Sequence, residues 1–186
     1  MTVPADSISQ ASWGSPIVVV LAGVPGAGKT TLARELITRT GMWYLSRDDI
    51  RVAMFQPCAF TDEEKFASFE AMALALAVNL RLGRSCITEG MPFSRAGELE
   101  RIEGIAVACN ARVASFLLDV PLEVAAVRVG HDARDGQGRV DAHDRVPALV
   151  SDVAARMRTF PASTRRLDAT RPVADLADEV LRTIAA

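Results

Sequence analysis

The chain has 186 residues, of which 49% are hydrophobic and 24% charged, a composition that is ordinary for one globular domain with a substantial core. Lys and Arg number 21 and Asp and Glu 23, so the formal net charge of −2 excludes a global basic field that would gather nucleic acid or an anionic membrane. A local basic groove is still possible. The sequence has neither an apolar run of roughly 18 residues, as a membrane span needs, nor the charged-then-apolar start of a signal peptide. We therefore expect a single cytoplasmic domain without a membrane partner.

Residues 1–15 mix Ser, Ala, Asp and Gly without periodicity, which predicts a flexible leader before a domain of residues 16–186. Five later segments read as strands and alternate with helical segments, which predicts an α/β three-layer sandwich around a parallel sheet of about five strands. The expected strands are residues 17–22, 42–46, 84–88, 112–118 and 164–167. The expected helices end near residues 39, 82, 110, 129, 160 and 184.

Two helix starts carry N-cap signals. The long helix that ends near residue 82 has Thr61 as its predicted N-cap, with acidic residues in the first turn. Its core face is predicted from helical spacing to consist of Phe66, Phe69, Met72, Leu76 and Leu80. Ser94 is the predicted N-cap of the helix after the third strand.

The most informative stretch is Gly-Val-Pro-Gly-Ala-Gly-Lys-Thr-Thr at residues 23–31, which fits the phosphate-loop pattern G-x-x-x-x-G-K-[ST] at every required position. It follows an apolar strand and opens a helix, so backbone N–H groups and the helix N-terminus converge where a polyphosphate would lie. Lys29 would reach the β- and γ-phosphates, and the Thr30 hydroxyl would bind Mg²⁺. The alternative is a glycine-rich turn that binds nothing. It does not explain why the loop is preceded by a strand and followed by a helix, as the phosphate-loop motif requires. The predicted nucleotide-binding residues are Gly23, Pro25, Gly26, Ala27, Gly28, Lys29, Thr30 and Thr31.

Acidic residues follow two further strands at their carboxyl ends, where ligands bind in open α/β sheets. Asp48, after the second strand, is placed where a general base for an acceptor hydroxyl would be, although Asp48 or Asp49 could instead cap a helix entered at Ile50. Glu89, after the third strand, is expected to support the Mg²⁺ water shell or to orient the acceptor. Met91 and Phe93 would then form an apolar lip for the acceptor beside Glu89.

The phosphate loop together with Ser-Arg-Asp-Asp-Ile-Arg at residues 46–51 resembles the P-loop kinase group that includes the 5′-hydroxyl polynucleotide kinases. Chloramphenicol phosphotransferases and gluconate kinases are similar in plan. The resemblance implies the P-loop NTPase fold, ATP and Mg²⁺ as cofactors, Asp48 as general base and Arg51 as the residue that holds an acceptor phosphate. Those polynucleotide kinases carry Asp-Thr-Asn where this chain has Glu89-Gly90-Met91, a departure that removes two hydrogen-bonding side chains on the acceptor side.

The same resemblance implies a lid over ATP whose arginines neutralise charge on the transferring phosphoryl group. The polar stretch at residues 130–144 reads as a mobile flap, and the lid is expected to span about residues 128–145. Arg128 and Arg134 are the candidate catalytic arginines, with Arg139 and Arg145 as competitors; any of them could instead be a solvated surface charge. Arg171 lies in a loop that resembles the one beside the adenine base, but that loop also fits an ordinary strand-to-helix turn.

These observations predict an ATP-dependent kinase that moves the γ-phosphate to a hydroxyl of a small acceptor such as a sugar, a nucleoside or an antibiotic-like compound. Two alternatives stay open. One is a 5′-hydroxyl polynucleotide kinase, which the resemblance of Arg51 favours and the net charge disfavours. The other is a nucleotide-binding regulatory module without an acceptor, which would not need a base such as Asp48.

Overall fold

The computed structural model describes residues 14–90, 97–135, 147–157 and 159–185, and for residues 132–135 the backbone only. Met91, Phe93, Ser94, Arg139 and Arg145 lie outside the described residues. No described helix has the length and apolar character that a membrane crossing requires.

Five parallel strands form one sheet in the order β2-β3-β1-β4-β5, which confirms the predicted fold class. Every residue of β1, the central strand, is buried, because neighbouring strands flank both of its edges and helices cover both of its faces. The strands are β1 (Ile17–Ala22), β2 (Trp43–Ser46), β3 (Cys86–Glu89), β4 (Arg112–Asp119) and β5 (Arg165–Asp168).

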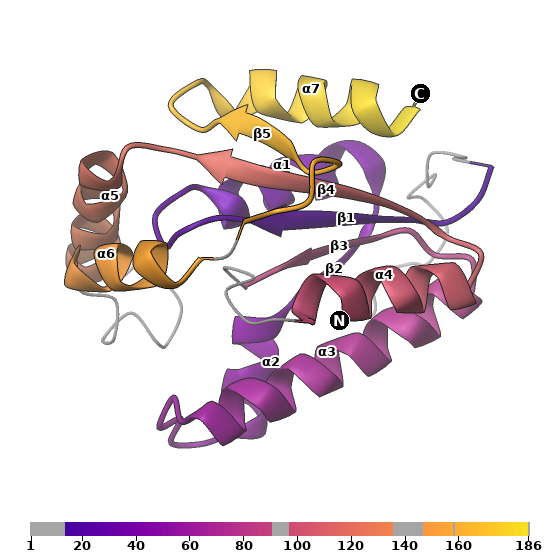
Figure 1. Ribbon diagram of the computed structural model, residues 1–186, viewed down its shortest axis with the longest axis horizontal. Coiled ribbons are helices and arrows are strands. Elements are labelled where there is room, and N and C mark those ends of the chain that lie inside the picture. The colour runs from indigo at the N-terminus through magenta and orange to yellow at the C-terminus, as the bar shows by residue number, and fades with distance from the viewer. Residues whose placement is uncertain (1–13, 91–96, 136–146, 158, 186) are drawn as a thin grey trace, which may run out of the picture.

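Helices cover the two faces of this sheet (Figure 1). On one face α1 (Lys29–Thr40) and α7 (Val173–Ala185) pack on Ile17, Val19 and Leu21. On the other face α3 (Asp62–Arg81) and α4 (Glu98–Ala108) pack on Val18, Val20 and Ala22. Alternate residues of β1 therefore anchor two separate cores, as a strand buried on both faces requires.

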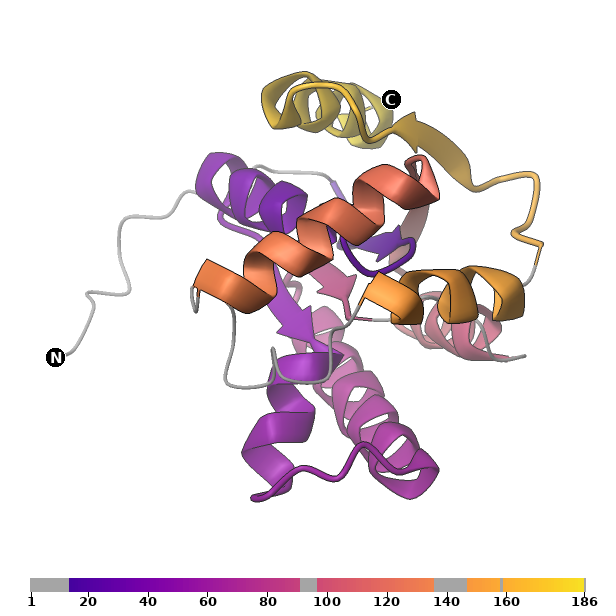
Figure 2. The same ribbon diagram turned by 90° about the vertical axis from the view of Figure 1, so that its left-hand side faces the viewer.

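The three other helices lie around the carboxyl ends of the strands. They are α2 (Arg47–Met54), α5 (Leu122–Asp135) and α6 (Pro147–Arg156). Figure 2 looks toward these strand ends and shows α5 passing across them with α6 beside it. Because α2 follows β2 without a gap, its first turn brings charged residues directly to the carboxyl edge of the sheet.

The structure corrects several predicted boundaries. α5 runs to Asp135, so residues 130–135, which were expected to begin the flap, are helical. Their polar composition suits a helix with one solvated side, and the buried Val129 anchors the preceding turn. The remaining residues of the expected flap, 136–144, lie outside the described residues. α4 begins at Glu98 after Gly97, four residues beyond the predicted Ser94 cap, and α6 ends at residue 156 instead of near 160.

Phe66 was wrongly placed in the core. Its side chain is 60% exposed, whereas Phe69, Met72, Leu76 and Leu80 are buried as predicted. Phe66 lies at the margin of the buried face of α3, and helical spacing alone does not separate the margin of a face from its centre.

The start of α3 is a complete capping box, which confirms Thr61 as N-cap. The Thr61 hydroxyl accepts a hydrogen bond from the Glu64 N–H, and the Glu64 carboxylate accepts one from the Thr61 N–H. Glu64 also accepts a hydrogen bond of 3.0 Å from the Ala59 N–H, which is the main reason why the pKa of this carboxyl is lowered. This carboxylate therefore stabilises the fold above its ordinary pKa, and that contribution is lost as the pH falls.

We predict that Thr61→Ala lowers the free energy of unfolding by about 1 kcal/mol, because the Glu64 N–H in the first turn of α3 loses its acceptor. Urea denaturation would measure the change. Thr38→Ala is the matched control, since its exposed hydroxyl only donates to the Arg34 carbonyl within α1. Equal losses in the two variants would contradict the role of the capping box.

Candidate functional site

The phosphate loop is shaped by glycines in a conformation that other residues rarely adopt. Gly23, Gly26 and Gly28 have φ angles of 142°, 77° and 93°. The loop also lies tight against its neighbours: a Cβ on Gly26 would meet the Ala125 carbonyl oxygen at 2.3 Å, and one on Gly23 the Leu118 oxygen at 2.9 Å. β4 and α5 thus hold the loop in place.

Gly28 is the N-cap of α1, so no side chain of the cap covers the first N–H groups of that helix. An anion in the loop could accept hydrogen bonds from these N–H groups and would lie at the positive end of the helix dipole. The Lys29 ammonium folds back over the loop and donates hydrogen bonds of 2.9 Å to the carbonyls of Gly23 and Val24. A cation and the N–H groups of the first turn of α1 therefore lie where the sequence predicted a polyphosphate.

A buried carboxylate joins this loop to the neighbouring strands. Glu89, 1% exposed at the end of β3, accepts hydrogen bonds from the Thr30 hydroxyl at 3.2 and 3.3 Å. The Tyr44 hydroxyl on β2 donates to the same carboxylate. The structure thus brings together the two residues that the sequence predicted as metal ligands, although they are 59 positions apart.

Sequence reasoning missed Tyr44. It is the single tyrosine of the chain and lies two residues before the end of β2. Nothing in the local sequence distinguishes it from a residue that only packs within a strand. The available signal was the pairing of β2 with β3: a phenol on a strand beside a buried acid is placed to donate to that acid.

Thr30 and Glu89 offer oxygen donors that fit Mg²⁺, a cation commonly held by one or two protein oxygens, substrate phosphates and water. Across the described parts of the chain, no cluster of three or more His, Cys, Asp or Glu side chains could hold a metal without a substrate. The oxygen atoms of Thr30 and Glu89 therefore fit a metal ion that binds together with a nucleotide.

Asp48 lies in the first turn of α2. The helix begins at Arg47, and its N-cap is Ser46, whose hydroxyl accepts from the Asp49 N–H at 3.2 Å. Capping at Ile50 by Asp48 or Asp49 is therefore wrong. The Asp48 carboxylate, with its side chain 13% exposed, lies 3.2 Å from Arg51 and 3.9 Å from Arg47.

The Arg51 side chain is enclosed by its neighbours. Its side chain is 6% exposed, and its guanidinium lies 4.5 Å from the centre of the Phe60 ring. Among the described residues, its buried Nε has no hydrogen-bond partner. Phe60, also missed from the sequence, has a φ of 58°, which is unusual for a bulky residue and typical of strained backbone at functional sites.

The structure explains one departure from the polynucleotide kinases. Gly90 has a φ of 90°, and a Cβ there would lie 3.0 Å from the Asp48 nitrogen and 3.1 Å from the Arg47 nitrogen. Only glycine lets the end of β3 approach the start of α2 this closely. The missing polar side chain at position 90 is thus linked to the tight packing of Asp48 beside β3.

The predicted arginines have different surroundings. Arg128 donates to the Gly26 carbonyl at 3.4 Å and to the Ala169 carbonyl at 3.1 Å, so it bridges the phosphate loop and the loop after β5. Arg134 belongs to α5, but its side chain is outside the described part. Arg171 forms an ion pair of 2.7 Å with Glu179 on α7, and this carboxylate raises the pKa of Arg171.

We predict that Gly26→Ala weakens ATP binding at least tenfold, because the added methyl group collides with the Ala125 carbonyl and displaces the loop. Isothermal titration calorimetry would measure the ATP dissociation constant. Gly83→Ala is the matched control: its φ of 75° is equally unfavourable, but a Cβ there meets nothing within 4 Å. The loop assignment fails if both variants bind ATP as the parent does.

Comparisons with known proteins agree with this geometry. The family described as AAA domain matches residues 18–157. No curated protein matches the sequence.

Several solved structures share the fold at low identity. A gluconokinase from Sinorhizobium meliloti 1021 is 19% identical with a TM-score of 0.66, over 91% of this chain and 92% of that one. The Mycobacterium tuberculosis APS kinase CysC in complex with AMPPNP and APS is 15% identical with a TM-score of 0.67, over 92% and 99%. A chain of the Pnkp1/Rnl/Hen1 RNA repair complex is 18% identical with a TM-score of 0.59, over 80% and 48%.

Proposed function

This chain belongs to the AAA domain family, and from that premise we propose that it is an ATP-dependent phosphotransferase acting on a hydroxyl of a small-molecule acceptor. The observation that carries the proposal is the bridge between the phosphate loop and the neighbouring strand ends. Thr30 contacts Glu89 on β3, and Glu89 pairs in register with Ser46, two residues before Asp48. A phosphate site and a candidate base therefore share one edge of the sheet.

In the proposed reaction the acceptor oxygen bonds to the γ-phosphorus of ATP while the bond from that phosphorus to the β-γ bridging oxygen breaks, releasing ADP. Asp48 takes the proton of the hydroxyl. Lys29 and Arg128, both at the phosphate loop, supply positive charge to the phosphate oxygens. Thr30 and Glu89 would hold Mg²⁺, which neutralises charge on the β- and γ-phosphates when it is bound.

Two features support a small acceptor over a nucleic acid end. The net charge of −2 provides no basic field that would attract a nucleic acid. The Arg51 side chain is 6% exposed and already contacts Asp48 and Phe60. The polynucleotide alternative is kept because a chain of an RNA repair complex shares the fold.

An acceptor screen tests the proposal. ATP turnover should rise strongly with one or more sugars, nucleosides or hydroxylated antibiotics and should change little between two salt concentrations. Efficient, salt-sensitive labelling of a 5′-hydroxyl oligonucleotide, with no turnover of small molecules, would favour the polynucleotide kinase. ATP hydrolysis that no acceptor stimulates would favour the regulatory module.

We predict that Asp48→Asn lowers kcat for transfer by about 10²- to 10⁴-fold and leaves the ATP dissociation constant unchanged, because the shape is kept and the basicity is lost. The matched control is Asp49→Asn, on the same turn of α2. Loss of ATP affinity in the Asp48 variant, with kcat preserved, would make this residue a nucleotide or metal ligand.

We predict that Tyr44→Phe raises the Mg²⁺ concentration needed to tighten ATP binding by about tenfold, because a hydrogen bond to a charged group is worth roughly 1.5–3 kcal/mol and orients Glu89. Calorimetric ATP titrations at several Mg²⁺ concentrations would show the shift. Trp43→Phe is the control, since Trp43 is 44% exposed and contacts Arg84 instead. An identical Mg²⁺ dependence in parent and Tyr44 variant would contradict this role.

A further inference from the structure

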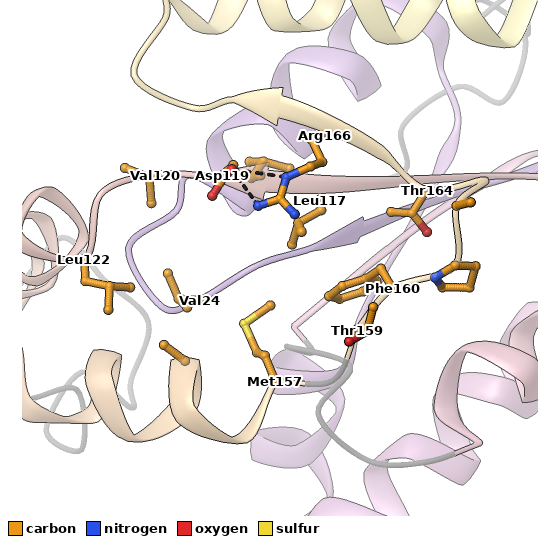
Figure 3. A pocket seen from close by; sticks show the side chains of 14 residues that line it. Val24, Leu117, Asp119, Val120, Leu122, Met157, Thr159, Phe160, Thr164 and Arg166 are labelled. Carbon is orange, nitrogen blue, oxygen red and sulfur yellow. Dashed lines mark hydrogen bonds and ion pairs between the residues drawn. The ribbon is translucent and has the colours of Figure 1, made fainter.

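A cavity that the proposed mechanism does not use opens beside the phosphate loop (Figure 3). Its volume is about 640 Å³, within the range of sites that enclose drug-sized ligands. The end of β4, the C-terminal part of α6 and residues 159–162 line it, together with Val24 of the phosphate loop. Figure 3 shows the side chains of Val24, Met157 and Phe160 pointing into the same space below β4.

The cavity borders both buried cores of the sheet, the one under α3 and α4 and the one under α1 and α7. Phe160 packs against the first core, to which Leu117 of β4 belongs, and Met157 packs against both. Val24, Leu118 and Val120, which also line the cavity, belong to the core on the α1 side. The cavity thus lies at the carboxyl end of β4, on the edge of the sheet where ligands usually bind in α/β folds.

Strand register gives the distance from this cavity to the candidate reaction centre. Leu117, on the cavity wall, pairs with Ala22, the residue before the phosphate loop. Val20 of β1 pairs with Thr88, so Glu89 on β3 is level with Leu21. Two strand spacings separate β4 at the cavity from β3 at Glu89, and a third leads to β2, whose end precedes Asp48, so the cavity lies about 14 Å from the candidate base across the strand ends. A molecule of that length spans both places.

The lining combines apolar side chains with a polar rim. Val24, Met157 and Phe160 supply apolar surface. At the rim Asp119 and Arg166 form an ion pair of 2.8 Å in which both side chains are more than half exposed, so it is readily exchanged for contacts with a ligand. Such a lining offers both apolar surface and polar groups to a molecule with an apolar body and polar substituents.

We propose that the acceptor is an amphipathic alcohol whose apolar, aryl- or alkyl-bearing body fills this cavity while its hydroxyl reaches over the phosphate loop toward Asp48. This inference rests on the proposed phosphotransferase function and narrows its substrate class. It excludes sugars and oligonucleotide ends as the principal acceptors.

The test fills the cavity without touching the phosphate loop. Ala154 of α6 lines the cavity, whereas Ala155, the next residue, is exposed and does not, so Ala154→Trp and Ala155→Trp form a matched pair. Calorimetry with a non-hydrolysable ATP analogue present would measure binding of 1-phenyl-1,3-propanediol, as amphipathic probe, and of sorbitol, as polyol. ATP binding by each variant reports whether the fold and the loop are intact.

We expect the phenylpropanediol to bind the parent and the Ala155 variant more tightly than sorbitol does, and to lose at least tenfold in affinity in the Ala154 variant, with ATP binding unchanged. Equal binding of the probe by both variants, or tighter binding of sorbitol by the parent, would overturn the inference. Neither result touches the phosphotransferase proposal, which is judged separately by acceptor-stimulated ATP turnover.

Discussion

The buried carboxylate of Glu89 is the interaction on which the arrangement of the site depends. A carboxylate that is 1% exposed is costly unless donors surround it, and here the hydroxyls of Thr30 and Tyr44 provide two. These donors belong to the phosphate loop's helix and to β2, so satisfying one charge fixes three elements relative to one another. The same contact places an acid beside a phosphate site.

Close backbone approaches complete this arrangement. The phosphate loop lies against β4 and α5 at Gly23 and Gly26, and the end of β3 lies against α2 at Gly90. Each approach needs a residue without a Cβ, which makes these glycines part of the architecture of the candidate site and not only of its turns. Catalysis by positioning and electrostatics requires such rigid placement of the groups around a phosphoryl centre.

Much of the fold could be predicted from the sequence because its signals were local. The apolar run of β1, the phosphate-loop spacing and the Thr61 cap each specify structure within a few residues. The meeting of Thr30 with Glu89 followed from the rule that parallel strands end at one edge. The roles of Tyr44 and Phe60 depended on side-chain contacts with Glu89 on another strand and with Arg51 on the preceding helix, for which a single sequence carries no periodic signal. The length of α5 was missed because its polar last turns resemble a loop in composition.

The position of Lys29 has a thermodynamic consequence. A lysine side chain that is free in solution loses up to about 2 kcal/mol of rotamer entropy when it is fixed on a ligand. Here the ammonium is already held by the Gly23 and Val24 carbonyls, so most of that loss is incurred on folding and not on binding. Nucleotide affinity should therefore gain from preorganisation of the loop, and the folding stability of the protein bears the corresponding cost.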